Sequence, residues 1–473
     1  MDKKYKYLGK NTLIFGISSF GTKILSFLLV PLYTAVLTTG EYGTVDLITT
    51  TATLLMYVLT LNISSAVLRF TLEKREYGRH FLAYGFRVIC VGTFVCFMLL
   101  GFTYIAGVVK WPIQYFLFVL LYFFTMAFYE LMSNYLRAID KVKEGAITGV
   151  LSSIIIIASN ILLLLVFKVG LVGYFLSMII GPAVASIYCV IVAREPIKTY
   201  VIVECKTDLK RDMLKYCVPL IFNNVALWIN AFLDRYFVTY FCGVSENGIY
   251  SVASKIPTIL STCYSVFASA WTLSAIKEFD SNDSDGFFSK TYNTYGALMT
   301  TACSVIIIFN VLLAHFLYSK QFFSAWRYSS VLVLSVMFNT LTVFQGSIYS
   351  AAKKTNLVAT TTIVSALINT ILNVILIPIM GALGAAIATA IAYYAMWFAR
   401  YISSKKFIKM RINLLKDSIV YLLIVLQIIF EHFEGHFYLG QIICVLMIAI
   451  INRPYIKNII EICTGKFKNV NSK

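Results

Sequence analysis

The sequence predicts an all-α, polytopic membrane protein with fourteen transmembrane helices. Hydrophobic residues make up 59% of the 473 residues and charged residues only 13%, which is too apolar for a soluble protein of this length. Runs of roughly 20 apolar residues recur along the whole chain, and each run is long enough to cross a bilayer as a helix. Basic residues gather in every second connection between these runs, as expected for a multi-pass protein.

The apolar runs place each predicted helix in the chain. Polar connections with Gly, Pro and charged residues separate neighbouring runs. The eleventh and twelfth helices are separated only by the stretch IPIMGA, and the fourteenth is short. The predicted spans are 12–37, 44–68, 81–107, 113–136, 146–167, 171–193, 214–241, 249–275, 292–318, 328–351, 357–377, 382–402, 414–430 and 437–452.

The distribution of Lys and Arg predicts the orientation. Most of the 40 basic residues lie in connections on the same side as the N-terminus, and the alternating connections hold only Lys110, Lys168, Lys320 and Arg327. This bias predicts both termini in the cytoplasm and an even number of crossings. It also explains the formal charge of +18 without nucleic acid as a partner.

An internal repeat predicts two lobes. Glu41 and Glu246 occupy matching positions in GEYG and SENG, and LVG at 171–173 matches ALG at 382–384, with nearly the same offset. Because six helices per copy is an even number, both copies run the same way, which predicts a pseudo-twofold axis along the membrane normal and a site where the lobes meet. The predicted domains are a six-helix lobe at 1–200, a second six-helix lobe at 201–405, and two extra helices with a basic cytoplasmic tail at 406–473.

Charged side chains inside the predicted helices are the candidate binding residues. An ionisable residue at the bilayer centre costs about 2.5–3.5 kcal/mol on insertion scales, so it is retained mainly where it faces a polar pathway or a partner. The residues predicted to line a central cationic cavity are Lys23, Arg87, Arg235, Lys255 and Asn230.

Two carboxylates inside the helices have a separate candidate role. Glu130 and Asp234 are predicted either to bind a coupling cation or to pair with the basic residues. The alternative is that all of these charged residues pair with one another and serve only to hold the helices together. Asp46 lies near a predicted helix end and is expected at the membrane interface.

The sequence contains no pattern of an enzyme or a metal protein. The ten cysteines include no CxxC pair, and the four histidines form no ligand pattern. No catalytic residue, metal site or cofactor is therefore expected. Polysaccharide polymerases and ligases are also polytopic, but they are expected to carry a large external loop with catalytic residues, and no predicted external connection here is long.

Several stretches, in order and spacing, resemble a known family. They are KNTLIFGISSFGTKILSFLLVPLYTAVLTTGEYGTVDL at 10–47, YLRAIDKVKEGAITGVLSS at 135–153, YSVASKIP at 250–257 and GALGAAIATAIAYYAMWFARY at 381–401. Together they resemble Wzx-type O-antigen and polysaccharide-unit flippases of the multidrug/oligosaccharidyl-lipid/polysaccharide (MOP) exporter superfamily. The resemblance covers roughly residues 10–405 and implies a MATE-like bundle of two lobes around a central cationic cavity.

The resemblance also implies the function. An undecaprenyl-diphosphate-linked oligosaccharide, such as an O-antigen or capsular repeat unit, would be moved from the inner to the outer leaflet of the bacterial cytoplasmic (inner) membrane by alternating access, with an H+ or Na+ gradient as the candidate energy source. Membrane lipids, a polysaccharide polymerase and a chain-length regulator are the expected partners. A multidrug/cation antiporter of the same superfamily is the first alternative, and a polysaccharide polymerase or ligase is the second.

Overall fold

The computed structural model describes residues 23, 27–107, 112–196, 199–200, 203–319, 321–352 and 354–463. Its regular secondary structure is entirely helical over these residues, which confirms the predicted all-α class. Contacts divide the chain into two compact units, Met1–Tyr236 with Val244–Gly248, and Phe237–Gly243 with Ile249–Lys473. The domain boundaries predicted at 200 and 405 stay a prediction.

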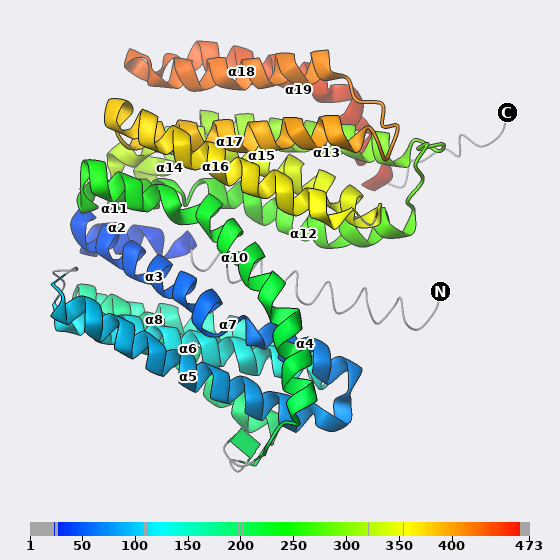
Figure 1. Ribbon diagram of the computed structural model, residues 1–473. Helices are drawn as coiled ribbons and strands as arrows, with labels where there is room; N and C mark the ends of the chain where they lie inside the picture. Colours follow the sequence, from blue (N-terminus) through cyan, green and yellow to red (C-terminus); the bar gives the residue numbers. More distant parts are fainter. Residues whose placement is uncertain are drawn as a thin grey trace. The chain divides into compact units, whose positions relative to one another are not determined.

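The first unit is built on four long helices that lie side by side, α5 to α8 (Figure 1). α6 packs against α3, α4, α5 and α8, and α7 packs against α8. Phe81, Phe123, Leu131 and Tyr135 are fully or almost fully buried between these helices. The unit contains α2 (Val30–Val36), α3 (Thr39–Leu59), α4 (Ile63–Glu73), α5 (Gly78–Ile105), α6 (Ile113–Ala138), α7 (Val142–Asn160), α8 (Leu171–Ala193) and most of α10 (Thr207–Cys242).

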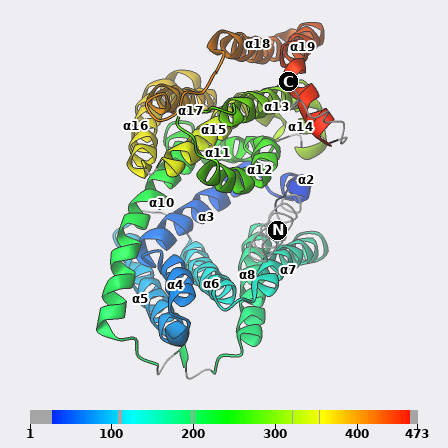
Figure 2. The same ribbon diagram turned by 90° about the vertical axis from the view of Figure 1, so that its right-hand side faces the viewer.

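The second unit is organised around α15. Within its membrane-crossing window 78% of the residues are buried, and α15 contacts α12, α13, α16 and α17 (Figure 2). Rings of Phe267, Trp271 and Phe344 stack beside it, with 4.2 Å between the last two ring centres. The helices are α11 (Val244–Ala253), α12 (Pro257–Lys277), α13 (Phe287–Ile308), α14 (Asn310–Leu317), α15 (Trp326–Ala351), α16 (Thr355–Met380), α17 (Ala382–Ser404), α18 (Leu414–His432) and α19 (Tyr438–Cys463), although contacts place the start of α11 in the first unit.

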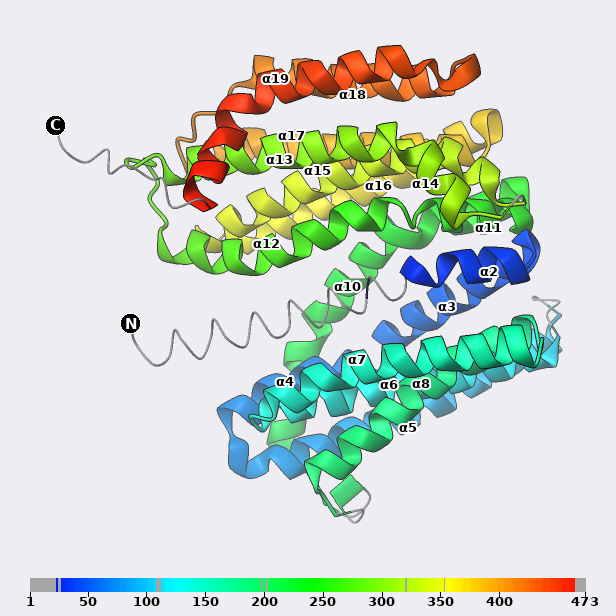
Figure 3. The ribbon, with the colours of Figure 1, turned by 180° about the vertical axis from the view of Figure 1, so that it is seen from behind.

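α18 and α19 form an antiparallel pair that packs on α13 within the second unit (Figure 3). Polar side chains make this contact. The Gln427 amide donates to the Ser304 carbonyl at 2.9 Å, and the Asn452 amide donates to the Thr300 hydroxyl at 3.0 Å. These bonds satisfy polar groups that would be expensive to leave unpaired in an apolar interior.

Breaks interrupt three of the predicted spans. Span 44–68 divides into α3 and α4 at Leu61 and Asn62, which both have φ near 50°. Span 249–275 divides into α11 and α12 at a turn over residues 254–256, and Pro257 opens α12, where its missing N–H costs no hydrogen bond. Span 292–318 divides at Phe309 into α13 and α14, with a bend of 59°. Hydropathy averaged over a whole span does not detect such breaks.

The fourteen predicted crossings stay a prediction. Apart from these breaks and a few residues at span ends, the predicted spans are helical where the structure describes them, and most of the first span lies outside the described residues. Ten of the described helices are long and apolar enough to cross a membrane, or eleven if α13 and α14 form one span. The chain is therefore a multi-pass membrane protein by helix length and composition.

Candidate functional site

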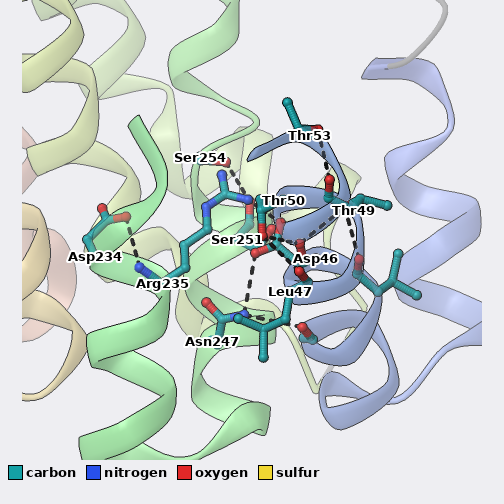
Figure 4. Close-up of polar contacts among 12 residues, drawn as sticks. Asp46, Leu47, Thr49, Thr50, Thr53, Asp234, Arg235, Asn247, Ser251 and Ser254 are labelled. Atoms are coloured by element: carbon teal, nitrogen blue, oxygen red, sulfur yellow. Dashed lines mark hydrogen bonds and ion pairs between the residues drawn. The ribbon is translucent and has the colours of Figure 1, made fainter. Parts of the chain in front are cut away.

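A buried ion pair joins α3 to α10 in the first unit. Arg235 of α10 donates from Nη1 to Oδ1 of Asp46, and the two side chains are only 11% and 9% exposed (Figure 4). Asn247 donates its amide to the other Asp46 oxygen at 3.4 Å and to the Gly43 carbonyl at 3.3 Å. Both oxygens of this carboxylate therefore have a donor, as a buried charge requires.

Further hydrogen bonds between α3 and α10 hold this ion pair in place. Trp228 donates its indole N–H to the Thr50 carbonyl at 3.1 Å. The hydroxyls of Thr51 and Tyr236 lie 2.6 Å apart. Because these contacts lie one to two turns from Asp46 and flank Arg235, α3 and α10 cannot slide past each other without breaking several bonds. We call Asp46, Arg235 and Asn247 the α3–α10 polar seam.

Two glycines allow the backbones next to this seam to touch. A Cβ added to Gly43 would lie 2.0 Å from the Val244 carbonyl oxygen, and one added to Gly248 would lie 2.0 Å from the Thr39 carbonyl oxygen. Val244 lies 205 positions after Thr39 and Gly248 lies 205 positions after Gly43, so each contact joins a residue of one copy to the residue that matches the other's partner. The contact is thus reciprocal, as expected where two copies of a repeat meet across a local two-fold axis.

Asp46 is the main correction to the sequence analysis. It was expected at the interface, but it is buried and paired. The helix starts earlier than predicted: α3 begins at Thr39, with a capping box in which Thr38 and Glu41 bond each other's backbone N–H. Asp46 therefore lies two turns inside the helix. For Arg235, the structure contains an ion pair, as the alternative of paired charges predicts.

Asp234 lies on the other side of α10 from Asp46 (Figure 4). It is 6% exposed, and its Oδ1 accepts the backbone N–H of Arg235 at 2.9 Å. Neighbouring residues on a helix point apart, so Asp234 and Arg235 present opposite charges to different surroundings. Asn230, one turn earlier, is buried and donates to the Ala226 carbonyl of its own helix at 3.1 Å.

Glu130 and Arg87 lie in separate polar contacts of the first unit. Glu130 on α6 accepts from the Ser64 hydroxyl of α4 at 2.9 Å. Arg87 on α5 is partly buried and donates from Nη2 to the Val203 carbonyl at 2.9 Å. Neither contact includes a residue of the α3–α10 polar seam.

The two predicted lysines are partly exposed. Lys255 lies in the turn between α11 and α12, and its backbone N–H donates to the Val252 carbonyl at 2.9 Å. Lys23 is helical, but residues 1–22 and 24–26 around it lie outside the described residues. That Lys23, Arg87, Asn230, Arg235 and Lys255 line one cavity stays a prediction.

Sequence reasoning missed Arg400 on α17. It is 3% exposed, and its guanidinium donates to the Thr361 hydroxyl at 2.9 Å, the Thr342 carbonyl at 2.7 Å and the Thr362 hydroxyl at 3.0 Å. Within the described part of the chain no carboxylate pairs with it. A lone arginine in an alanine-rich helix, with two threonines in the preceding helix, is the signal that could have identified it.

Among the described residues, no three His, Cys, Asp or Glu side chains lie close enough together to hold a metal ion. What the first unit offers is a buried ion pair, the buried carboxylate of Asp234, the partly buried carboxylate of Glu130, and hydroxyls. Such groups can bind and exchange charged ligands or small cations.

Comparison with known proteins identifies related folds. A family model described as polysaccharide biosynthesis protein matches residues 8–273. Among solved structures, the lipid II flippase MurJ in an inward closed conformation aligns with a TM-score of 0.70 and 18% identity, covering 95% of this chain and 100% of that one. No curated protein sequence matches the chain.

MATE transporters also align. An inward-facing multidrug resistance MATE family transporter of the MOP superfamily aligns with a TM-score of 0.65 and 13% identity, over 83% of this chain and 94% of that one. A Vibrio cholerae MATE transporter aligns with a TM-score of 0.59 and 12% identity, over 86% and 99% of the two chains. At these identities the likenesses establish a shared fold.

Proposed function

Since the chain belongs to the polysaccharide biosynthesis protein family, whose model matches residues 8–273, we propose that it is a flippase for a lipid-linked oligosaccharide. The substrate would be an undecaprenyl-diphosphate-linked repeat unit of O-antigen, capsule or another surface polysaccharide. The protein would move it from the inner to the outer leaflet of the bacterial cytoplasmic membrane by alternating access. The resemblance to the MOP superfamily seen in the sequence is confirmed by the family match and by the fold.

The observation that carries the proposal is the fold of a lipid flippase in a chain of this family. The MurJ structure is named a lipid II flippase, and it aligns over its whole length. The structures that align with this chain are a flippase and transporters rather than enzymes, which supports transport without covalent chemistry.

Arg235 of the α3–α10 polar seam would bind the anionic headgroup. Arg235 holds Asp46 through a planar guanidinium, which also matches phosphate oxygens in a bidentate geometry. A diphosphate that reached Arg235 would take the place of Asp46 as its acceptor. Lys23, Arg87 and Lys255 would bind the same headgroup at other stages of its path, with Asn230 as a neutral donor.

Movement of an anion requires a source of energy. An H+ or Na+ gradient is the proposed source, with Asp234 or Glu130 as the group that binds the coupling cation. Asp234 is the more deeply buried residue, at 6% exposed, and it neighbours Arg235 in sequence. A polysaccharide polymerase and a chain-length regulator would act on the translocated unit.

A multidrug/cation antiporter is the second candidate, because MATE transporters share the fold. Cationic drugs require acidic sites, and Asp234 and Glu130 supply one buried and one partly buried carboxyl group. Arg235 and Asp46 neutralise each other in the α3–α10 polar seam, so this seam alone favours neither charge of substrate.

One experiment separates the two candidates. The gene is deleted, and surface polysaccharide, externally accessible lipid-linked glycan and susceptibility to cationic drugs are measured. Variants Lys23→Ala, Arg235→Ala and Lys255→Ala are then tested for complementation at matched protein levels. The control is Arg69→Ala, which removes an exposed arginine paired with Glu73.

We expect the deletion and each of the three variants to reduce external glycan at least tenfold, whereas Arg69→Ala restores it. Normal polysaccharide with all three variants would overturn the cationic pathway. Normal polysaccharide in the deletion strain, together with greater drug susceptibility, would establish the antiporter instead.

A further inference from the structure

A second group of buried polar residues lies at the bend between α13 and α14, in the second unit. Glu431 of α18, Asn310 at the start of α14 and Ser330 of α15 are each 0% exposed. The Asn310 amide donates to Glu431 Oε1 at 2.7 Å and to the Trp326 carbonyl at 2.8 Å. Three helices therefore converge on one carboxyl group that the proposed function does not use.

Each of these three side chains keeps a buried oxygen that makes no hydrogen bond of full geometry. The three oxygens are Glu431 Oε2, Asn310 Oδ1 and Ser330 Oγ, and the Ser330 hydroxyl lies beside the Glu431 carboxylate. The orientation of the Asn310 amide follows from its neighbours. Turning it over would place Oδ1 against two acceptors, the Trp326 carbonyl and Glu431 Oε1. Asn310 Oδ1 and Glu431 Oε2 are thus the second oxygens of two groups that already touch.

Glu431 also has no cationic partner among the described residues. The described ion pairs do not include it. The neighbouring histidines are engaged elsewhere, since His432 contacts the Ile428 and Arg327 carbonyls and His436 Nδ1 contacts the Glu431 carbonyl. A buried carboxylate without a positive charge beside it is strongly disfavoured.

We propose that Glu431, Asn310 and Ser330 bind a sodium ion. Carboxylate, amide carbonyl and hydroxyl oxygens are hard ligands that suit a small, hard cation. A proton on Glu431 would neutralise the carboxylate and serve one neighbouring acceptor, whereas a cation placed between the three groups would neutralise the carboxylate and be coordinated by all of them. The ion would fasten α18 to the bend between α13 and α14. This inference does not depend on the proposed flippase activity.

The test measures thermal unfolding of the purified full-length protein in nanodiscs. NaCl is varied against choline chloride at constant ionic strength, with KCl as a second comparison. All measurements use the Asp234→Asn/Glu130→Gln background, so that a coupling ion at either residue does not contribute. We expect saturating Na+ to raise the Tm by about 3 °C or more, because a ligand that binds only the folded state stabilises it.

Matched variants locate the ion. Glu431→Gln supplies an amide in place of the carboxylate and should fold, with no Na+ response. Asp417→Asn removes another buried carboxylate of α18 and should keep the response. Ser330→Ala should raise the half-saturating Na+ concentration about tenfold. Ser329→Ala, whose hydroxyl already bonds the Ala253 carbonyl, should leave it unchanged.

Several results would overturn the proposal. They are an unchanged Tm in Na+ for the starting protein, a response that KCl reproduces equally, or a Glu431→Gln protein that keeps the response. A Tm that depends on pH but not on Na+ would assign a proton to Glu431 and would also exclude the sodium site.

Discussion

At the scale of single residues, the buried charges differ in how they are neutralised. Asp46 and Arg235 neutralise each other, with Asn247 as a third partner. Arg400 instead depends on hydroxyl and carbonyl oxygens alone. Removing one member of a buried ion pair leaves the other charge buried and unpaired, whereas removing both members leaves no unpaired charge. The Asp46–Arg235 pair and the Arg400 site should therefore respond differently to substitution.

The Asp46–Arg235 pair should show strong non-additivity. We expect Asp46→Ala alone to lower the free energy of unfolding by about 3–5 kcal/mol, because it leaves Arg235 buried and unpaired. The double variant Asp46→Ala/Arg235→Ala should recover a large part of that loss. A double-mutant cycle on unfolding of the purified protein measures the coupling, and additive losses would contradict the pairing.

Arg400 should tolerate neither alanine nor lysine. Its fork-shaped guanidinium bonds oxygens of α15 and α16 at once, and an ammonium group cannot copy that geometry. We expect Arg400→Lys to cost about 2–3 kcal/mol, since buried acceptors are left unsatisfied. The exposed Arg69→Lys is the control and should change stability by less than about 0.5 kcal/mol. Equal Tm values for the two variants would refute the role of Arg400.

At the scale of helices, close approach depends on Gly43 and Gly248. We expect Gly43→Ala and Gly248→Ala each to destabilise the protein by about 1–3 kcal/mol, because the added methyl group collides with a carbonyl oxygen of the neighbouring helix. Gly101→Ala is the matched control: it lies within α5 and has no neighbouring atom within 4 Å of an added Cβ. That change should be neutral or stabilising by up to about 1 kcal/mol. Unfolding temperatures of the three proteins decide the matter.

The helices themselves were predictable, but their breaks were not. Apolar run length located α5, α6, α8 and α15 to within a few residues, because burial in lipid demands that length. The break at Asn62 and the bend at Phe309 occur within apolar sequence, and tertiary contacts decide them.

The candidate site was only partly predictable. The sequence shows that Asp234 and Arg235 lie within a helix, but it cannot show that Arg235 meets Asp46, which is 189 positions away. Asp46 was misplaced because the polar stretch before it resembles an interface, while the capping box at Thr38 and Glu41 extends the helix through that stretch. Glu431 and Arg400 lie near the ends of predicted spans, where a charge is ordinarily exposed, so burial could not be inferred for them.

At the scale of the whole molecule, the bend between α13 and α14 decides the topology. The two helices are either one broken span or a re-entrant segment that returns to the side it came from. If the segment is re-entrant, every connection after it lies on the opposite side of the membrane from the predicted one. The connection with Lys405, Lys406, Lys409 and Arg411 would then face away from the cytoplasm, against the bias of the rest of the chain.

We therefore expect α13 and α14 to cross the membrane together. Reporter fusions at Ser284, Ser319 and Lys409 test this, with alkaline phosphatase active only outside the cytoplasm and green fluorescent protein fluorescent only inside it. Ser284 and Lys409 should report the cytoplasm, and Ser319 the outside. A cytoplasmic Ser319 together with an external Lys409 would establish the re-entrant arrangement. That result would remove one crossing and place the C-terminus outside, because each helix after the bend would be inverted. Moving the four basic residues at 405–411 to the external side should be unfavourable in the presence of an inside-negative potential, at about 2.3 kcal/mol per charge for each 100 mV, which is why the crossing arrangement is the expected one.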